Sequence, residues 1–152
     1  MQIFDHVNVR EVEKDDINFI FNSFVNCLSK YHESFFKGWE HKDVLKYLEF
    51  LIVWCLNNDK YSVFVACNKD DSTQILSYII VNSKGNEIFF QYTKYGYRKL
   101  GIQKHLLMPL CLNLDEQIVT NWATKEMIKL AKANRITIKH QFVLNMLQGE
   151  MK

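Results

Sequence analysis

The residues best placed to do chemistry are basic side chains and two glycines between positions 94 and 104. They form the run Tyr95-Gly96-Tyr97-Arg98-Lys99-Leu100-Gly101-Ile102-Gln103-Lys104. A strand-like stretch precedes this run and helical spacing follows it, so the run spans a turn and a helix start. Backbone amides at a helix start have no partner within the helix, and the helix dipole is positive there. With Arg98, Lys99 and Lys104, these amides predict a site for phosphate or pyrophosphate. The alternative interpretation is a tight turn with solvated basic side chains.

The cysteines and histidines predict neither a hydrolase nor a metal site. Cysteines stand at positions 27, 55, 67 and 111, with no Cys-x-x-Cys pair and no cluster of histidines. This spacing favours isolated buried thiols in a reducing compartment over a metal site or disulfides. His105 and Cys111 lie six positions apart on one expected helix, which is too far for a thiol–imidazole pair.

Length and composition predict one domain spanning residues 1–152. The chain is 48% hydrophobic and 14% aromatic, which supplies a core of ordinary size. Its formal net charge of +2, from 19 basic and 17 acidic residues, does not favour a nucleic-acid partner. The longest apolar stretch, Tyr47–Leu56, contains Glu49 and is much shorter than the roughly 18 residues that a membrane span needs. The first residues lack a secretion signal. We therefore expect an intracellular, cytoplasmic protein without a membrane segment.

Upstream of the turn, the apolar pattern changes from helical to strand-like. A β-leaning stretch at 3–9 precedes a helix that begins near Asp15, with apolar residues at intervals of three and four. A second helix begins at His41 and ends at the turn-forming residues 57–59. Three β-rich runs separated by turn clusters then predict consecutive antiparallel hairpins. These runs cover 61–67, 74–81 and 87–93.

Downstream of the turn, helical and strand patterns alternate. A helix from Ile102 meets Pro109, which predicts a kink there or a stop near Met108. The later elements are a strand at 117–122, a helix at Thr124–Lys132 and a β-like closing stretch at 136–144. The expected order is therefore β-α-α-β-β-β-α-β-α-β.

The turn and its helix resemble the acetyl-CoA signature of the GNAT family of N-acetyltransferases. That signature is Arg/Gln-x-x-Gly-x-Gly/Ala, followed by a helix that ends in paired leucines. Arg98 and Gly101 match its first and fourth positions, and Leu106 and Leu107 match the paired leucines. Gln103 stands at the sixth position, where the family has a small residue that lets the helix start lie close to the pyrophosphate. The expected element order also matches the family through nearly the whole chain.

The resemblance implies an α/β domain of the α+β type, with a mixed, mostly antiparallel central sheet flanked by helices. A GNAT domain closes with a hairpin, whereas few residues follow Arg135 here. The closing hairpin is therefore expected to be abbreviated. One wall of the acceptor site would then be incomplete, or it would come from another chain in a homo-oligomer or a larger assembly.

The resemblance also implies transfer of an acetyl group from acetyl-CoA, the co-substrate, to the amine of an unidentified acceptor. In the family, the fourth strand splays from the fifth, and its backbone holds the pantetheine arm and the thioester carbonyl. The residues in these positions here are Gln91, Tyr92 and Thr93. The pyrophosphate of coenzyme A would lie on Arg98, Lys99, Leu100, Gly101, Ile102, Gln103 and Lys104. Asn121, at the end of the expected fifth strand, would contact the pantetheine or a water.

Glu87 is the candidate general base. It stands at the start of the fourth strand, where the histone-acetyltransferase branch of the family has its glutamate. Strand alternation predicts that Glu87, Phe89 and Gln91 share one face. The alternative is a solvent-exposed glutamate at the strand end. The tyrosine acid that many members carry on the helix after strand five is missing from 124–132.

Two other functions stay open from the sequence. Gln103, the missing tyrosine acid, the short end and Pro109 favour a catalytically inactive GNAT-like module for binding or assembly, such as part of a virus particle or larger complex. The basic turn alone favours a small nucleic-acid-binding domain. The aromatic connector at 31–39 is expected either to line the acceptor site or to close the core.

Overall fold

The computed structural model describes residues 3–30, 36–83, 87–98, 100–107, 118–120 and 138–140. The strands are β1 (Val7–Glu11), β2 (Tyr61–Asn68), β3 (Ile75–Asn82), β4 (Glu87–Thr93), β5 (Ile118–Thr120) and β6 (Ile138–His140). The α-helices are α1 (Ile17–Ser29), α3 (His41–Leu56) and α4 (Ile102–Leu107). Short 3-10 helices cover Ile3–His6, Lys14–Asp16 and Tyr95–Tyr97. In this part of the chain, no helix has the length and apolar character needed to cross a membrane.

The strands form one mixed sheet in the order β1-β2-β3-β4-β5-β6. Neighbours from β1 to β4 are antiparallel, whereas β5 runs parallel to β4 and β6 runs parallel to β5. The expected mixed, mostly antiparallel sheet is thus confirmed. Between β4 and β5, the pairing covers only Glu87 with Val119 and Ile88 with Thr120. Beyond Ile88, the β5 edge of β4 has no strand partner among the described residues.

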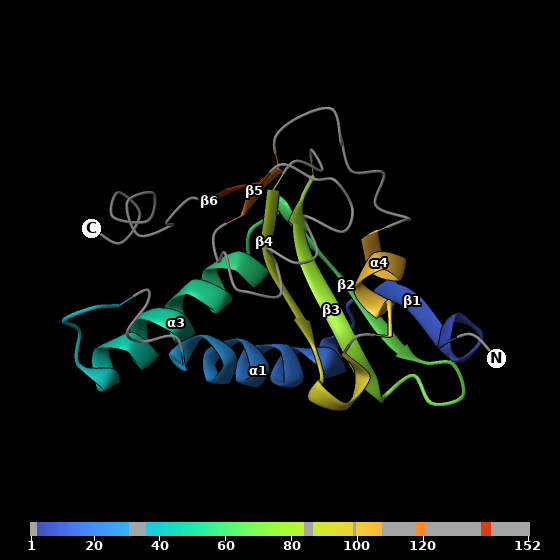
Figure 1. Ribbon diagram of the computed structural model, residues 1–152. Helices are drawn as coiled ribbons and strands as arrows, with labels where there is room; N and C mark the ends of the chain where they lie inside the picture. Colours follow the sequence, from blue (N-terminus) through green and yellow to red (C-terminus); the bar gives the residue numbers. More distant parts are fainter. Residues whose placement is uncertain are drawn as a thin grey trace.

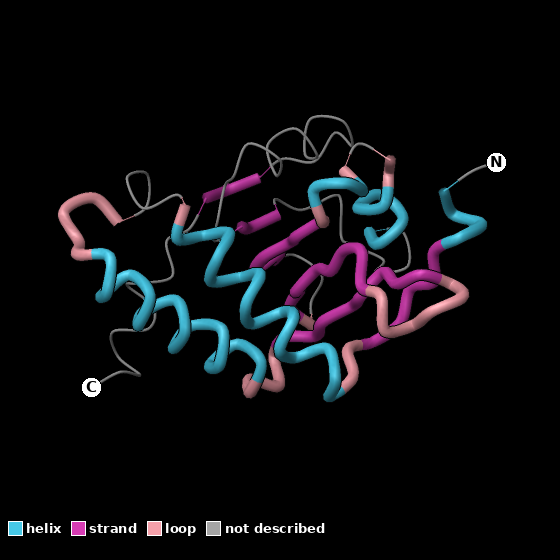
Figure 2. The backbone as a smooth tube through the Cα atoms, turned by 90° about the horizontal axis from the view of Figure 1, so that it is seen from below, coloured by secondary structure: helices cyan, strands magenta, loops and turns pink. Residues whose placement is uncertain are grey.

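Helices cover both faces of the sheet (Figure 1). Helices α1 and α3 lie side by side on one face and run in roughly opposite directions, which Figure 2 shows from below. Each helix turns one apolar stripe toward the strands, as the spacing of its apolar residues predicts. Helix α4 lies on the opposite face, where Ile102 and Leu106 pack in one cluster with Ile79, Val81 and Ile88.

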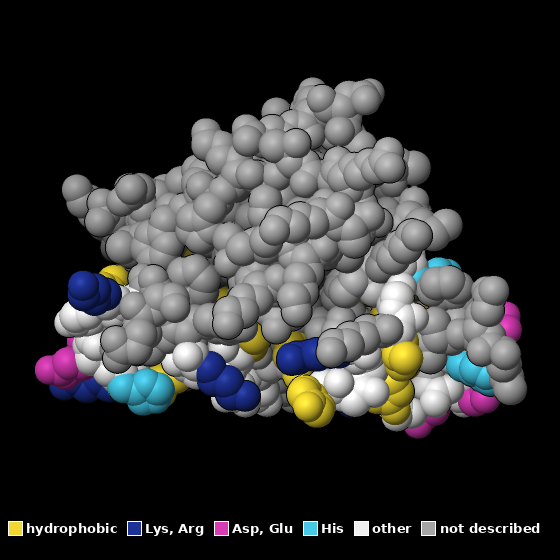
Figure 3. Space-filling model, in the orientation of Figure 1, with side chains coloured by type: hydrophobic (Ala, Val, Ile, Leu, Met, Phe, Trp, Pro, Cys, Tyr) yellow, Lys and Arg dark blue, Asp and Glu magenta, His cyan; other side chains and the backbone are white. Residues whose placement is uncertain are grey.

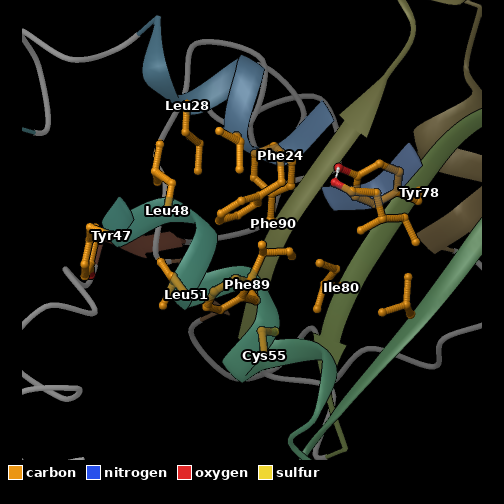
Figure 4. Packing of buried hydrophobic residues seen from close by; sticks show 14 of the residues in the cluster. Phe24, Leu28, Tyr47, Leu48, Leu51, Cys55, Tyr78, Ile80, Phe89 and Phe90 are labelled. Carbon is orange, nitrogen blue, oxygen red and sulfur yellow. Dashed lines mark hydrogen bonds between the residues drawn. The ribbon is translucent and has the colours of Figure 1, made fainter. Parts of the chain in front are cut away.

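Aromatic rings form the centre of the core between α1, α3 and the sheet (Figure 4). Phe24 on α1 stacks on Phe89, with ring centroids 6.1 Å apart, and meets Phe90 edge to face at 4.9 Å. Tyr78 is fully buried, and its hydroxyl oxygen lies 2.8 Å from Ser23 Oγ. Because a buried hydroxyl without a partner costs stability, this contact explains why a tyrosine is tolerated there.

A β-bulge interrupts β4 at Phe89. Ile80 pairs with Phe90, and the next residue of β3, Val81, pairs with Ile88. Phe89 is thus an extra residue, and both it and Phe90 belong to the core between the sheet and the helices α1 and α3. The bulge shifts the alternation of side chains along the rest of the strand.

The prediction that Glu87, Phe89 and Gln91 share one face is therefore wrong. Glu87 lies on the α3 side, where its carboxylate accepts a hydrogen bond from Tyr61. Gln91 pairs with Ile79, which packs on the α4 side. Strict alternation holds only where no residue is inserted, and the strand pattern carries no separate signal for the insertion.

The first strand begins later than the sequence predicts. Residues Ile3–His6 form a 3-10 turn, and β1 covers Val7–Glu11 rather than 3–9. Pairing with β2 defines this strand, and the pairing begins with Val7 opposite Asn68. The β-leaning composition begins at residue 3, which is four residues before the first residue of β1 that pairs with β2.

Several expected features lie outside the described residues. They are the kink at Pro109, Cys111, the helix at Thr124–Lys132 and all of the closing segment except Ile138–His140. The aromatic connector is described only from Phe36 onward. The Phe36 and Trp39 rings lie 5.3 Å apart, and both pack against Tyr47. The described part of the connector therefore closes the core.

A buried ion pair fixes the start of α1 against β1. Arg10 donates two hydrogen bonds to Asp16, from Nη1 to Oδ2 at 2.6 Å and from Nη2 to Oδ1 at 3.0 Å. Asp16 is 4% exposed, and its Oδ2 also accepts a hydrogen bond from Glu13 N at 2.7 Å. Arg10 Nη2 donates as well to Ser72 O, in the loop between β2 and β3. These hydrogen bonds, led by those from Arg10, hold the pKa of Asp16 below its usual value.

We expect Asp16→Asn to destabilise the protein by about 2–3 kcal/mol at neutral pH, because it breaks a largely buried ion pair. Since the pKa of Asp16 is lowered in the folded state, its stabilisation is present above the ordinary aspartate pKa of about 3.9. It is lost as the pH falls through the lower folded value. Urea unfolding across the acid range should therefore show the gap between wild type and variant closing below about pH 4.

The matched control is Asp15→Asn, at the exposed neighbouring acid. It should change the free energy of unfolding by less than about 0.5 kcal/mol. A gap between wild type and Asp16→Asn that stays the same at low pH would contradict the ion-pair explanation.

Candidate functional site

The candidate site is the corner between the end of β4, the following turn and the start of α4. Strand β4 ends at Thr93, and the 3-10 helix Tyr95–Tyr97 then turns the chain away from the sheet. The first hydrogen bond of α4 runs from His105 N to Gly101 O at 3.1 Å. The amides of residues 102–104 precede this bond and have no acceptor within the helix. The described backbone thus contains the strand, turn and helix start that the basic run predicts.

Of the two glycines in the turn, Gly101 is the one that the backbone requires. Its φ is +83°, in the left-handed region that residues with a Cβ disfavour. Gly96 lies in the 3-10 helix without a positive φ, and a Cβ added there would meet no atom within 4 Å. The glycine at the fourth signature position is therefore needed for conformation, whereas Gly96 is replaceable.

Arg98 is anchored to the end of β4. Its Nε donates to Thr93 O at 2.9 Å, and its guanidinium carbon lies 5.7 Å from the centre of the Tyr95 ring. Tyr95 is 86% exposed, so this cation–π contact lies at the surface. The hydrogen bond from Nε leaves the two Nη groups of Arg98 as donors for an anion.

The other predicted phosphate contacts are less completely described. Leu100 is 45% exposed next to Gly101, and the Lys94 ammonium lies over the Phe19 ring, 5.1 Å from its centre. Two predicted phosphate contacts fall outside the described part, Lys99 and the side chain of Lys104. Asn121, the predicted contact of the pantetheine or a water, also falls outside it. Among the side chains coloured in Figure 3, Lys and Arg form separate groups rather than one continuous patch.

Gln103 points toward the sheet. Its Nε2 lies 2.7 Å from Ser77 Oγ, 3.0 Å from Thr93 Oγ1 and 3.1 Å from Tyr92 O. Ser77 Oγ in turn donates to Tyr92 O at 2.7 Å. These groups form one network at the seam between β3 and β4, on the side that α4 covers. The side chain at the sixth signature position therefore takes part in packing the helix start onto the strands.

Ser77 belongs to this network, although it is not among the site residues that the sequence predicts. It is fully buried in β3, opposite Thr93. The available signal was a serine inside the mostly apolar run Ile75–Val81, because a buried hydroxyl needs a partner. Its partners prove to be Tyr92 O and the amide of Gln103.

Two amide oxygens on the same side of β4 are buried without a hydrogen-bond partner among the described residues. They are Gln91 Oε1 and Gln103 Oε1. Gln91 precedes Thr93 by two positions, so both side chains leave the strand on the α4 face. Buried carbonyl oxygens are normally satisfied. This corner therefore has the capacity to accept N–H donors from a bound molecule.

Glu87 lies at the opposite end of β4, on the far side of the bulge from the turn. Its Oε1 accepts a hydrogen bond from Tyr61 Oη at 2.7 Å, and its backbone N donates to Asn82 Oδ1 at 3.0 Å. It is half-buried, unlike the solvated strand-end glutamate of the alternative interpretation. Tyr61 is not predicted as its partner from the sequence. Its signal was positional, because alternate strands of an antiparallel meander begin at the same end of the sheet.

In the part of the chain that the structure describes, neither a reactive thiol nor a metal cluster accompanies Glu87. The Cys55 thiol is buried, and burial raises its pKa, so it stays protonated at neutral pH. Within the described ranges, no three His, Cys, Asp or Glu side chains lie together as metal ligands would. The described chemistry is that of hydrogen-bond donors and acceptors around β4.

In three dimensions, the chain is similar to several solved structures, acetyltransferases among them. It matches a possible acetyltransferase from Clostridium difficile 630 with a TM-score of 0.52 and 18% identity, over 86% of this chain and 88% of that one. It matches the aminoglycoside N-acetyltransferase AAC(6')-Iy in complex with CoA with a TM-score of 0.50 and 11% identity, over 90% and 91% of the two chains. It also matches the apo form of YjaB from Escherichia coli with a TM-score of 0.50 and 11% identity, over 85% and 79%.

These likenesses and the order of the strands show that the chain has the GNAT fold. The fold that the resemblance to the GNAT signature implies is thereby confirmed. At the level of sequence, no family model and no curated protein matches the chain. Identities this low establish the fold, and the reaction has to be argued from the site.

We expect Gly101→Ala to lower the midpoint of thermal unfolding by a few degrees. A Cβ at a φ of +83° costs about 1 kcal/mol. The matched control is Gly96→Ala, which should be neutral or slightly stabilising because its Cβ meets open space. Differential scanning calorimetry of both variants measures the difference. Equal midpoints for the two variants would show that the turn does not depend on Gly101.

Proposed function

We propose that the protein transfers an acetyl group from acetyl-CoA to the amine of an acceptor. The observation that carries this proposal is the edge of β4 beyond Ile88, which leads into the turn and α4 of a GNAT fold. AAC(6')-Iy, which shares this fold, was solved in complex with CoA. In this chain, the same edge and turn offer hydrogen-bonding groups to a long ligand with an anionic end.

The turn suits the pyrophosphate of coenzyme A. The amides of residues 102–104 precede the first hydrogen bond of α4, and Arg98 and Lys104 add positive charge to the same short segment. Gln103 is held on the sheet by its contacts with Ser77 and Tyr92. Its side chain therefore does not need the space that a phosphate would occupy.

The corner between β4 and α4 suits the pantetheine arm of coenzyme A, which carries two amide N–H groups. Gln91 Oε1 and Gln103 Oε1 are buried acceptors that such donors would satisfy. The backbone of Gln91–Thr93 lies along the same strand, and every second residue directs its N–H and C=O to the edge that has no strand partner among the described residues. We assign these groups to the arm, with the thioester toward the bulge.

Acetyl transfer needs a neutral amine, stabilisation of the oxyanion that forms on the thioester carbonyl, and a proton for the leaving thiolate. The amine nitrogen attacks the carbonyl carbon, the C–S bond breaks, and coenzyme A leaves as the thiol. Backbone amides on the edge of β4 would stabilise the oxyanion. Glu87 is the candidate base, and the hydrogen bond from Tyr61 orients its carboxylate.

The alternative of an inactive GNAT-like module draws in part on Gln103 at the sixth signature position. The contacts of Gln103 with the sheet weaken that argument, because the side chain is accommodated beside β3 and β4. No described contact favours a module over an enzyme. A measurement of acetyl-CoA binding separates the inactive module from the enzyme.

We expect acetyl-CoA and coenzyme A to stabilise the folded protein by about 2.7 kcal/mol at a hundredfold excess over Kd. The midpoint of thermal unfolding should rise accordingly. Arg98→Ala should weaken binding, and more strongly at low salt, because the attraction to phosphate is screened. Lys42→Ala removes an exposed cation from α3 and is the matched control. The absence of any shift at millimolar coenzyme A would overturn the proposed function.

We expect Glu87→Gln to lower kcat for acetylation of a primary amine by about 100-fold, the usual contribution of a general base. The affinity for coenzyme A should change little. A panel of primary amines, followed by release of the coenzyme A thiol, supplies the measurement. Tyr61→Phe keeps the carboxylate and removes only its hydrogen bond, so its loss should be smaller. An unchanged kcat in Glu87→Gln would remove Glu87 from the mechanism.

A further inference from the structure

We propose that Gln103 is a positioning residue that clamps the start of α4 onto the end of β4. The inference rests on the proposed function for the identity of the ligand, coenzyme A. The clamp itself consists of hydrogen bonds within the protein. It joins the strand end assigned to the pantetheine arm with the helix start assigned to the pyrophosphate.

The clamp is one amide nitrogen surrounded by acceptors from two strands. Gln103 Nε2 lies within 3.1 Å of Ser77 Oγ, Tyr92 O and Thr93 Oγ1. Ser77 belongs to β3, and the other two belong to the end of β4. Because the nitrogen carries two hydrogens, two of these bonds form at a time. An apolar side chain of the same length would offer nothing to these acceptors.

Arg98 holds the same strand end from the other side of the turn. Its Nε donates to Thr93 O, the carbonyl that follows Tyr92 O. Successive carbonyls along a strand point to opposite edges. Gln103 and Arg98 therefore hold opposite edges of β4. Arg98 precedes Gly101 and Gln103 follows it, so the turn is tied to the strand at both of its ends.

At the sixth signature position, a small residue favours binding by leaving space for the pyrophosphate, whereas Gln103 would favour it by holding the helix start in place. If small size is what the position needs, Gln103→Gly makes room and tightens the binding of coenzyme A. If the clamp is what it needs, Gln103→Gly releases the helix start and weakens binding. Groups that are already in position lose less conformational freedom when a ligand binds. The two explanations therefore predict changes of opposite sign.

Isothermal titration calorimetry with coenzyme A tests the clamp in the full chain. We expect Gln103→Gly and Gln103→Met to weaken binding by about tenfold, the size expected for lost hydrogen bonds. Ser77→Ala removes one of several acceptors and should weaken binding less. Asp16→Asn is the control, since it destabilises a contact between β1 and α1 and should leave the affinity of the folded protein unchanged.

Hydrogen exchange adds a readout that does not depend on coenzyme A. In Gln103→Met, the amides of α4 should exchange faster relative to those of β2 and β3, which Asp16→Asn should not reproduce. Tighter or unchanged binding by both Gln103 variants would overturn the clamp and leave the proposed function intact. If the wild type does not bind coenzyme A, the proposed function falls. Hydrogen exchange in Gln103→Met then tests the clamp by itself. Faster exchange of the α4 amides supports the clamp, and unchanged exchange overturns it.

Discussion

Two neighbouring phenylalanines of β4 determine how the rest of the site is arranged. Phe89 and Phe90 both pack against Phe24 of α1, although neighbours in a regular strand point to opposite faces. Burial of a phenylalanine side chain contributes about 1.5–3 kcal/mol, so the core gains from accepting the irregular backbone. The bulge sets the direction of every side chain that follows it. As a result, Gln91 and Thr93 face α4 and become part of the candidate site.

The same strand has two differently supported halves. Within the described residues, its first residues pair with β3 on one edge and with β5 on the other, whereas its last residues pair only with β3. Backbone groups on a strand edge need partners from elsewhere. On the β5 edge, Arg98 supplies one for Thr93 O, whereas Gln103 and Ser77 add donors to Tyr92 O on the opposite edge, which β3 occupies. The Arg98 side chain thus supplies, at this end of β4, a hydrogen bond of the kind that β5 supplies at the other end.

The elements of the fold are predictable from the sequence because each follows one repeating rule. Helices α1 and α3 show apolar spacings of three and four, and turn clusters bound β2, β3 and β4. The bulge is not predictable in this way, because it depends on the burial of Phe89 in a core whose other residues are distant in the chain. The position of the turn follows from its glycines and basic residues. Which glycine it needs depends on φ, and only the folded backbone distinguishes Gly101 from Gly96.

A sequence signature records residue types one position at a time, whereas a ligand binds to the surface that several residues form together. A glutamine at the sixth position would crowd a phosphate if its side chain lay along the turn. Here its amide finds acceptors at a polar seam inside the sheet, and Ser77 is the part of that seam contributed by β3. With an apolar residue in place of Ser77, the glutamine amide would lose its shortest hydrogen bond and be freer to turn away from the sheet. Gln103 and Ser77 therefore act as a pair, and the effect of Gln103 on ligand binding depends on both residues.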